Sequence, residues 1–451
     1  MFIKGTMQRA IVVFVLFTGL ATGGVIAAET HGVKINHWTT DQGVRVYHVE
    51  APEIPMVEFE LQFDAGAARD GELGGLAMLT NGLIAEGAAD LDASAIAARF
   101  ESVGAIYGNS SQRDAASLSL RSLTDPPLLN QALETFVLVL GKPTFPQDSL
   151  ERERSRMLVG LQSEQESLES LSEKAFYKAL YNSHPYAAPE RGTEATVKAI
   201  KREDVQRFFN DYYVASNAVL AIVGAVTEEE ARSLAGKIGS ALKKGQPAPA
   251  LPPVASLEKP NTVRLNHPSQ QAHILMGQPG VRRGDPDYFA LYVGNHILGG
   301  SGLVSRLAEE IREKRGLSYS QYSYFAPMRL EGPYILGLQT KVEQAEQARQ
   351  LLHDELKKFI AEGPTDAELQ AAKQNITGGF PLRIAGNSKI VGYLGMIGFY
   401  KLPLDYLETF NANIEAVTKE QIKAAFAKRV NPEKLVTVVA GGEAAAPDAG
   451  G

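Results

Sequence analysis

The sequence contains no cysteine among its 451 residues. Disulfides, thiolate metal sites, a thiol nucleophile and a cysteine-anchored lipid are therefore excluded. An excess of positive charge is also lacking, because 45 lysines and arginines stand against 52 aspartates and glutamates and form no basic stripe. A nucleic-acid surface needs such a stripe to neutralise phosphates. The rest is an ordinary globular composition, 44% hydrophobic and 22% charged, at a length that favours two domains.

Long apolar runs are lacking beyond the N-terminus. There, Lys4 and Arg9 precede the apolar residues 10–20, and small residues follow up to Ala27 and Ala28. This order is typical of a signal peptide, whereas a membrane-spanning helix needs about 20 apolar residues. We therefore expect residues 1–28 to direct export and the mature chain to be periplasmic or secreted. An uncleaved N-terminal anchor is the alternative.

A proline-rich segment divides the chain into two similar lengths. Residues 241–262 cannot sustain a helix or a central strand, because they contain Pro247, Pro249, Pro252, Pro253 and Pro260. We expect an interdomain linker there. It separates an N-terminal domain at residues 29–240 from a C-terminal domain at residues 263–443, with a flexible tail at residues 444–451.

The two halves end in a similar stretch of sequence. Residues 200–224 align without a gap on residues 417–441, and apolar residues coincide, for example Phe209 with Phe426. Each copy predicts a helix, a turn and a β-branched strand that ends in glycine. A chance match is the alternative, since such units are common. We predict an α+β fold with two tandem, similar domains, each with a mainly antiparallel sheet covered by helices.

Periodicity predicts further elements in both halves. In the first half we expect strands over residues 44–49 and 56–65, an exposed strand over 116–123, and helices over 74–84 and 93–102. In the second half we expect strands over residues 272–277, 319–325 and 334–340, and helices over 287–298, 304–315 and 344–362.

Histidine spacing does not support a metal site. None of the eight histidines stands three or four residues from another on a plausible helix, which is the spacing that a zinc pair on one helical face needs. His184 precedes Pro185, so a structural turn is favoured there over a metal ligand. We predict no zinc site formed by this chain alone.

The glycine-rich residues 299–303 suggest two other kinds of site. A nucleophile elbow, Gly-x-Ser-x-Gly, would need glycine where Leu303 stands. A phosphate-binding loop would need a Lys-Ser/Thr pair after the glycines, and none follows. A flexible turn is the ordinary interpretation.

Residues 305–325 carry the most informative pattern. Their predicted helix ends in a cationic turn, with Gly316 where a left-handed cap is needed, and a strand then begins. Arg312 in that last turn and Tyr319 at the start of the strand can donate hydrogen bonds toward one point. Such donors would hold a peptide carbonyl or a developing oxyanion. A basic last turn capped by glycine is also common in helices without this function, so both interpretations stay open.

The same segment resembles the pitrilysin/insulinase-type zinc peptidases. In that family a helix-to-strand signature of the C-terminal domain carries an Arg and a Tyr seven positions apart that assist the zinc site, and Arg312 and Tyr319 keep this spacing. Further matches cover most of the mature chain: His184-Pro185-Tyr186 with Gly192, Asp204 with Phe208, Tyr213 with Asn217, and the strand ending at Gly224. The family also has paired domains of similar α+β topology.

The sequence departs from this family at the metal site. Catalytic members carry His-x-x-Glu-His on the first helix of the N-terminal domain, where the two histidines bind zinc and the glutamate activates water. Here the corresponding residues are Met78, Asn81 and Gly82. The third ligand of the family, a glutamate, falls near Gly160, with Glu164 one turn further. Asn81 cannot take a proton from water.

The resemblance therefore implies a metal-free subunit. Family members that lack the zinc motif but keep the Arg and Tyr form one half of a heterodimer with a homologous partner that carries His-x-x-Glu-His and the zinc. Arg312 and Tyr319 would then stabilise the transition state on a peptide substrate, and Gly299, Gly300, Ser301 and Gly302 would contact the substrate backbone. The alternatives are a non-enzymatic peptide-binding or scaffold protein with a peptidase-like fold, and a stand-alone zinc peptidase with an unrecognised site.

Overall fold

The computed structural model describes residues 33–442. The predicted signal peptide, residues 1–28, and the predicted tail, residues 444–451, lie outside this range. None of the helices in the described part of the chain has the length and apolar character needed to cross a membrane.

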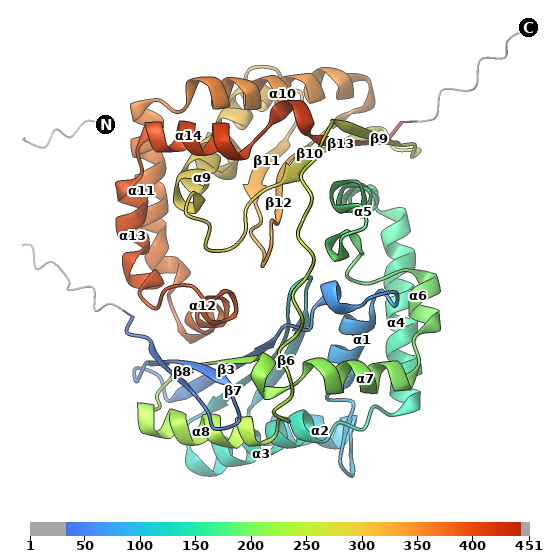
Figure 1. The fold of residues 1–451 in the computed structure, drawn as a ribbon, viewed down its shortest axis with the longest axis vertical. Helices are drawn as coiled ribbons and strands as arrows, with labels where there is room; N and C mark the ends of the chain where they lie inside the picture. Colours follow the sequence, from blue (N-terminus) through green and yellow to red (C-terminus); the bar gives the residue numbers. More distant parts are fainter. Residues whose placement is uncertain (1–32, 443–451) are drawn as a thin grey trace, which may run out of the picture. The chain divides into compact units, whose positions relative to one another are not determined.

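The first half is built on a six-stranded sheet in the order β1-β2-β8-β3-β7-β6. This sheet lies in the lower part of Figure 1, where β3, β6, β7 and β8 are labelled. Its strands are β1 (Asn36–Thr39), β2 (Arg45–Glu50), β3 (Met56–Phe63), β6 (Ile106–Ser111), β7 (Ala116–Leu123) and β8 (Ala218–Gly224). Within the described strands of this sheet, only β2 and β8 pair in parallel. Every second residue of β3 is buried, whereas all seven residues of the central strand β8 are buried. The sheet therefore buries both faces near β8.

Eight α-helices and a short hairpin accompany this sheet in the described residues. The helices are α1 (Leu76–Leu83), α2 (Ala93–Glu101), α3 (Pro126–Gly141), α4 (Gln147–Glu166), α5 (Leu168–Tyr181), α6 (Glu194–Ala199), α7 (Arg202–Tyr212) and α8 (Glu228–Ser240). The hairpin joins β4 (Gly87–Ala88) to β5 (Leu91–Asp92).

The second half is built on a five-stranded sheet in the order β11-β12-β10-β13-β9. Its strands are β9 (Asn261–Leu265), β10 (Gln271–Pro279), β11 (Ser320–Phe325), β12 (Pro333–Lys341) and β13 (Val436–Ala440). Its α-helices are α9 (Tyr288–Asn295), α10 (Ala345–Glu362), α11 (Asp366–Arg383), α12 (Asn387–Tyr400), α13 (Tyr406–Ala416) and α14 (Lys419–Arg429). Only β13 and β9 pair in parallel.

The two sheets repeat one topology, which confirms the predicted fold class. In each sheet the last strand lies between a parallel neighbour and an antiparallel one: β8 between β2 and β3, and β13 between β9 and β10. The aligned sequence repeat corresponds to α7 with β8 in the first half and to α14 with β13 in the second.

Two of the predicted elements need correction. The strand predicted as exposed, β7, lies between β3 and β6, and its inward side chains are buried. The helix predicted over residues 304–315 begins after Ser305, because Gly302 adopts φ +63° and Ser305 is extended, with its hydroxyl accepting the N–H of Ala308. Residues 302–304 form a separate 3-10 turn, and residues 308–313 are π-helical.

Each half packs one of its helices on the sheet of the other half. α12 of the second half packs on β8 and β3, and α5 of the first half packs on β10 and β13 (Figure 1). The α12 contact is close: a Cβ on Gly398 would lie 2.4 Å from the Val219 side chain. Phe176 of α5 is fully buried in one apolar cluster with Val436 and Val438 of β13. One apolar face of each sheet is therefore covered by the other half of the chain.

Residues 241–260, between α8 and β9, form no helix or strand. Hydrogen bonds hold this segment against the first half, and three of them involve residues 248–252. Arg69 donates to the Pro249 carbonyl at 2.7 Å, the Ala248 N–H donates to Asn217 at 3.2 Å, and His184 Nε2 donates to the Pro252 carbonyl at 2.9 Å. The turn predicted at His184 is present as a 3-10 turn, Pro185–Ala187, whose Tyr186 N–H donates to His184 Nδ1.

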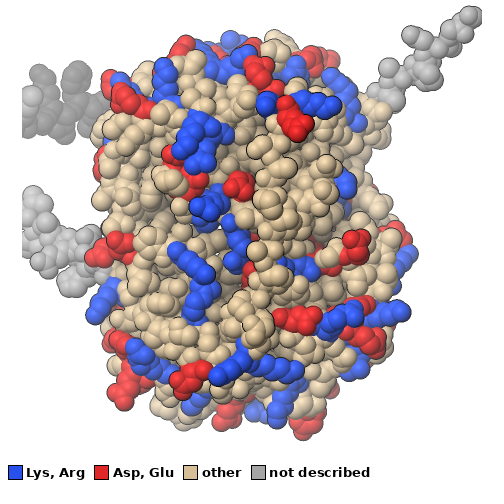
Figure 2. Space-filling model, viewed as in Figure 1, with Lys and Arg blue, Asp and Glu red and all other residues tan. Residues whose placement is uncertain are grey.

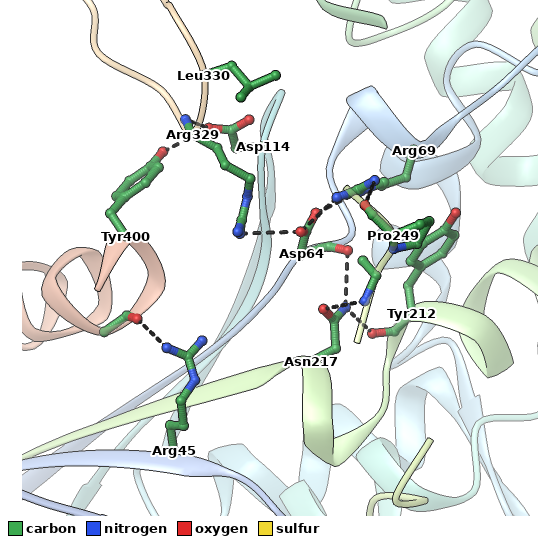
Figure 3. Close-up of polar contacts among 12 residues, drawn as sticks. Arg45, Asp64, Arg69, Asp114, Tyr212, Asn217, Pro249, Arg329, Leu330 and Tyr400 are labelled. Carbon is green, nitrogen blue, oxygen red and sulfur yellow. Dashed lines mark hydrogen bonds and ion pairs between the residues drawn. The ribbon is translucent and has the colours of Figure 1, made fainter. Parts of the chain in front are cut away.

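Polar contacts also join the halves (Figure 3). Asp64 accepts two hydrogen bonds of 2.8 Å from Arg69 and lies 3.3 Å from Arg329 of the second half. Arg45 donates to the Gly398 carbonyl at 2.7 Å. Lys and Arg side chains gather near the centre of the face shown in Figure 2. Buried carboxylates such as Asp64 therefore hold arginines at this junction, as burial of charge requires.

Candidate functional site

Helix α1 carries the positions that correspond to the zinc motif. The buried carboxylate of Asp70 caps its first turn by accepting the N–H groups of Gly75 and Ala77, both at 2.7 Å. Burial raises the pKa of Asp70 to about 7, although these two hydrogen bonds act in the opposite direction. The cap fixes where α1 begins, and hence which side chains of the helix face the neighbouring cavity.

The three motif positions line one cavity of about 270 Å³ beside α1. Asn81 is 2% exposed, and its amide donates to the Tyr213 hydroxyl at 3.1 Å and to the Ser117 carbonyl at 3.3 Å. Asn81 is thus part of the core and not a surface residue. Met78 packs partly against the same core, and nothing lies within 4 Å of a Cβ placed on Gly82.

This donor set does not fit a zinc ion. A thioether, a hydrogen-bonded amide and a glycine offer neither imidazole nor carboxylate, the groups that zinc sites use besides thiolate. Within residues 33–442, no group of three or more His, Cys, Asp or Glu side chains could hold a metal ion.

The guanidinium of Arg191 lies at the position that corresponds to the third zinc ligand. A Cβ on Gly160 of α4 would stand 3.1 Å from Nη1 and 3.3 Å from Cζ of Arg191. One turn further along α4, Glu164 accepts from Arg191 Nε at 2.7 Å and pairs with Lys174 at 2.6 Å. Burial acts to raise the pKa of Glu164, but the hydrogen bonds from Lys174 and Arg191 outweigh it and lower that pKa. Glu164 is therefore an anion already held by two cations.

Arg312 and Tyr319 lie side by side at the surface of the second half. The Arg312 guanidinium carbon is 5.9 Å from the Tyr319 ring centroid, and Arg312 pairs with Glu313 at 3.4 Å. Tyr319, just before β11, is 87% exposed. Gly316 between them adopts φ +60°, the left-handed cap that the sequence predicts. Both donors are therefore accessible from solvent and close to one another.

The glycine-rich segment is divided between two kinds of helical turn. Gly299 and Gly300 end a π-helix, His296–Gly300, while Ser301 and Gly302 lead into the 3-10 turn. A Cβ on Gly299 would stand 2.5 Å from the Ser323 hydroxyl, so close packing alone accounts for this glycine. The turn leaves Leu303 and Val304 exposed, at 62% and 83%.

The structure thus brings the predicted residues together in two groups. Met78, Asn81 and Gly82 line the cavity beside α1, and Arg312 and Tyr319 form a pair elsewhere that does not line it. Sequence reasoning missed Arg191. The only signal for it was its position directly before Gly192, one of the residues that carries the family resemblance.

Comparisons with known proteins agree with this architecture. A family model described as "Insulinase (Peptidase family M16)" matches residues 45–194, and one described as "Peptidase M16 inactive domain" matches residues 199–376. The crystal structure of a peptidase M16 inactive domain from Pseudomonas fluorescens has 40% sequence identity, a TM-score of 0.88, and coverage of 91% of this chain and 99% of its own.

Two bacterial relatives extend over most of the chain. The uncharacterized zinc protease YmxG of Bacillus subtilis is 24% identical over 393 residues, which cover 85% of this chain and 94% of that protein. The non-peptidase homolog YmxG of Helicobacter pylori is 25% identical over 423 residues, which cover 92% and 94%. Given two adjacent family models and the close match to the Pseudomonas fluorescens structure, this chain belongs to peptidase family M16.

Proposed function

We propose that this chain is the metal-free subunit of a heterodimeric zinc metallopeptidase, acting with a homologous partner that carries His-x-x-Glu-His. The observation that carries the proposal is the adjacency of Arg312, whose side chain is 31% exposed, and Tyr319, which is 87% exposed; neither side chain is part of the buried core. Zinc in the partner would activate water and polarise the peptide carbonyl. This chain would bind no cofactor of its own.

In this mechanism the two side chains act on one oxygen atom. The Arg312 guanidinium and the Tyr319 hydroxyl donate hydrogen bonds to the oxygen of the scissile carbonyl as it becomes negatively charged. Donors fixed at such a point typically contribute 10²- to 10³-fold to turnover. Residues 299–302 would lie along the substrate backbone, with Gly302 allowing the turn that exposes Leu303 and Val304. The mature subunit would act in the periplasm or outside the cell.

A non-enzymatic peptide-binding or scaffold role is the second candidate. It is favoured by the absence of zinc donors on α1 and by a relative over nearly the whole chain that is named a non-peptidase homolog. The two proposals differ in whether Arg312 and Tyr319 affect hydrolysis.

The test is peptide hydrolysis by this chain alone, by the zinc-bearing partner alone and by their mixture. We expect activity only in the mixture, and a fall in turnover of about 10²- to 10³-fold with Arg312→Ala or Tyr319→Phe. Matched controls are Arg349→Ala, a partly exposed arginine paired with Glu346 in the same half, and Tyr324→Phe, on β11. Both controls should keep full activity.

Two outcomes would contradict the proposal. Chelator-sensitive hydrolysis by the isolated chain would mean that it holds its own metal. A mixture whose activity is unchanged by Arg312→Ala and Tyr319→Phe would favour the scaffold role.

A further inference from the structure

A loop after the His-Pro-Tyr turn delivers Arg191 to the cavity beside α1. Gly192 adopts φ +74°, and a Cβ on it would stand 2.0 Å from the Gly74 carbonyl oxygen. The loop and the start of α1 are therefore in backbone contact that only glycine permits. This contact fixes the backbone of Arg191 next to α1, and its side chain then reaches across α4 to Gly160 and Glu164.

Two cavities meet at this side chain. The first, of about 270 Å³, contains the three motif positions, and the second, of about 210 Å³, contains Glu164 and Lys174; Met78 and Arg191 line both. The first cavity is also lined by Asn109, Ser110 and Ser111 of β6, the edge strand of the sheet, which offer amide and hydroxyl groups. Its volume suits a single residue at the end or on the side of a peptide.

Two nitrogen atoms of the Arg191 guanidinium are available to bind a ligand. Its Nε is engaged by Glu164, while Nη1 and Nη2 have no hydrogen-bond partner among the described residues. The side chain is 36% exposed. Gly160 has no side chain that could fill the space in front of the guanidinium. A planar guanidinium with two free N–H groups matches a carboxylate in shape and in charge.

The charges of the two cavities differ. Arg113, Lys174 and Arg191 in the second cavity are balanced by Glu164, Glu173 and Glu190. In the first cavity Arg156 and Arg191 face the single carboxylate Glu153, which is already paired with Arg156. Arg191 is thus the one charge in the first cavity without a counter-ion among the residues that line that cavity, because its partner Glu164 lines the second cavity and is shared with Lys174. An anionic ligand is therefore favoured over a cationic one in the first cavity.

We infer that the cavity beside α1 binds a carboxylate of a peptide, with Arg191 as the principal donor and Arg156 adding positive charge. A guanidinium thus stands beside the position that corresponds to the family's third metal ligand, and it would hold a ligand without cleaving it. The inference rests on the proposed function only in taking a peptide as the ligand. The carboxylate could be the α-carboxylate of the last residue or an acidic side chain, and both present the same planar pair of oxygens.

The experiment is fluorescence anisotropy with the isolated, metal-free chain and short labelled peptides of one uncharged sequence. The three probes carry a free C-terminus, an amidated C-terminus, or an amidated C-terminus with one internal glutamate. We expect the amidated, uncharged peptide to bind at least tenfold more weakly than one of the two carboxylate-bearing peptides. Which of the two binds better identifies the source of the carboxylate.

Variants separate binding from folding. Arg191→Gln should weaken carboxylate binding tenfold or more, and Arg191→Lys should restore part of it, because charge returns without the planar pair of donors. Glu164→Gln should tighten binding, because it removes the carboxylate that competes for the guanidinium. If the Arg191–Glu164 pair had only a structural role, Arg191→Gln and Glu164→Gln would both weaken peptide binding.

Arg156→Gln has a matched control in Arg207→Gln. Both arginines are 65% exposed and pair with an acidic residue three positions earlier, Glu153 and Asp204 respectively, but Arg207 lies on α7 and does not line the cavity. Arg156→Gln should weaken binding and Arg207→Gln should not. Equal binding of all three peptides, or unchanged binding by a folded Arg191→Gln protein, overturns the inference. Because no partner is present, failure here leaves the hydrolysis test of the mixture unaffected.

Discussion

The buried hydroxyl of Tyr186 donates a 2.6 Å hydrogen bond to the carboxylate of Asp114. The same carboxylate accepts the backbone N–H of Arg329 at 2.6 Å and the hydroxyl of Tyr400, at the end of α12, at 3.2 Å. Figure 3 shows Asp114 beside Arg329, with Tyr400 close to both. The Tyr186 oxygen in turn accepts the N–H of Leu330 at 3.2 Å. The tyrosine of the His-Pro-Tyr motif thus ties the first half to the loop between β11 and β12.

Tyr186→Phe should therefore destabilise the whole chain. The change removes one of three donors from a buried carboxylate and leaves the Leu330 N–H without its acceptor, which should cost about 1–3 kcal/mol in the free energy of unfolding. Urea unfolding monitored by circular dichroism measures it. Tyr400→Phe, which loses a single and longer hydrogen bond to Asp114, should cost less. An equal or larger loss with Tyr400→Phe would contradict this account.

Arg312→Ala and Tyr319→Phe should leave stability nearly unchanged. Tyr319 is 87% exposed, and Arg312 has one surface ion pair, with Glu313, which contributes little in water. We expect each change to alter the free energy of unfolding by less than about 0.5 kcal/mol. The same urea titration, beside Tyr186→Phe as a positive control, measures this. A loss above 1–2 kcal/mol would mean that the pair stabilises the fold. A loss of hydrolysis in these variants could then not be assigned to transition-state binding.

Much of the fold is predictable because short-range patterns carry it. Alternation over β3 predicts its buried face, since Val57, Phe59, Leu61 and Phe63 all point to the core. Position within a sheet is not predictable in this way. β7 alternates as an edge strand would, and only its pairing with β6 makes it internal. The helix start at Ser305 was missed because it depends on a local left-handed turn at Gly302.

The same distinction between local pattern and long-range contact decides which residues of the candidate site could be predicted. Met78, Asn81 and Gly82 follow from the resemblance to the family, and Arg312 and Tyr319 from that resemblance together with their spacing. Arg191 does not, because its place depends on the contact between Gly192 and Gly74, which lie far apart in the chain. The exchange of α5 and α12 between the halves was equally invisible, since an amphipathic helix pattern does not say which sheet the helix covers.

Asp70 should make the chain less stable as pH rises from about 4 to 7. Burial raises its pKa from 3.8 in the unfolded chain to about 7, so across this window the folded protein holds a proton that the unfolded chain has released. Stability therefore falls with rising pH, by on the order of 4 kcal/mol at most, and levels off above 7. Asp70→Asn does not titrate, so its stability relative to the wild type should increase over this range. Parallel curves for the two proteins would contradict the assignment.

Titration of His184 should have the opposite effect on stability: the free energy of unfolding should rise with pH in the range just below neutrality. Burial lowers its pKa below the ordinary 6.5, although the hydrogen bond to the Pro252 carbonyl acts against this. Its Nδ1 accepts the N–H of Tyr186, and a proton on that nitrogen would remove the acceptor. The unfolded chain takes up the proton first, so this contribution is present above pH 6.5 and is lost as pH falls through the folded pKa. In His184→Gln, unfolding free energy measured from pH 7.5 to 5 should fall less steeply than in the wild type. The protonated ring keeps the Nε2–H that donates to the Pro252 carbonyl, so the contact that is lost is the one from the Tyr186 N–H to Nδ1. Protection of the Tyr186 amide against hydrogen exchange, corrected for the intrinsic rate, should therefore fall in the wild type over the same interval. A steeper fall in the variant, or unchanged protection of the Tyr186 amide, would show that Nδ1 of the neutral imidazole does not contribute to stability as an acceptor.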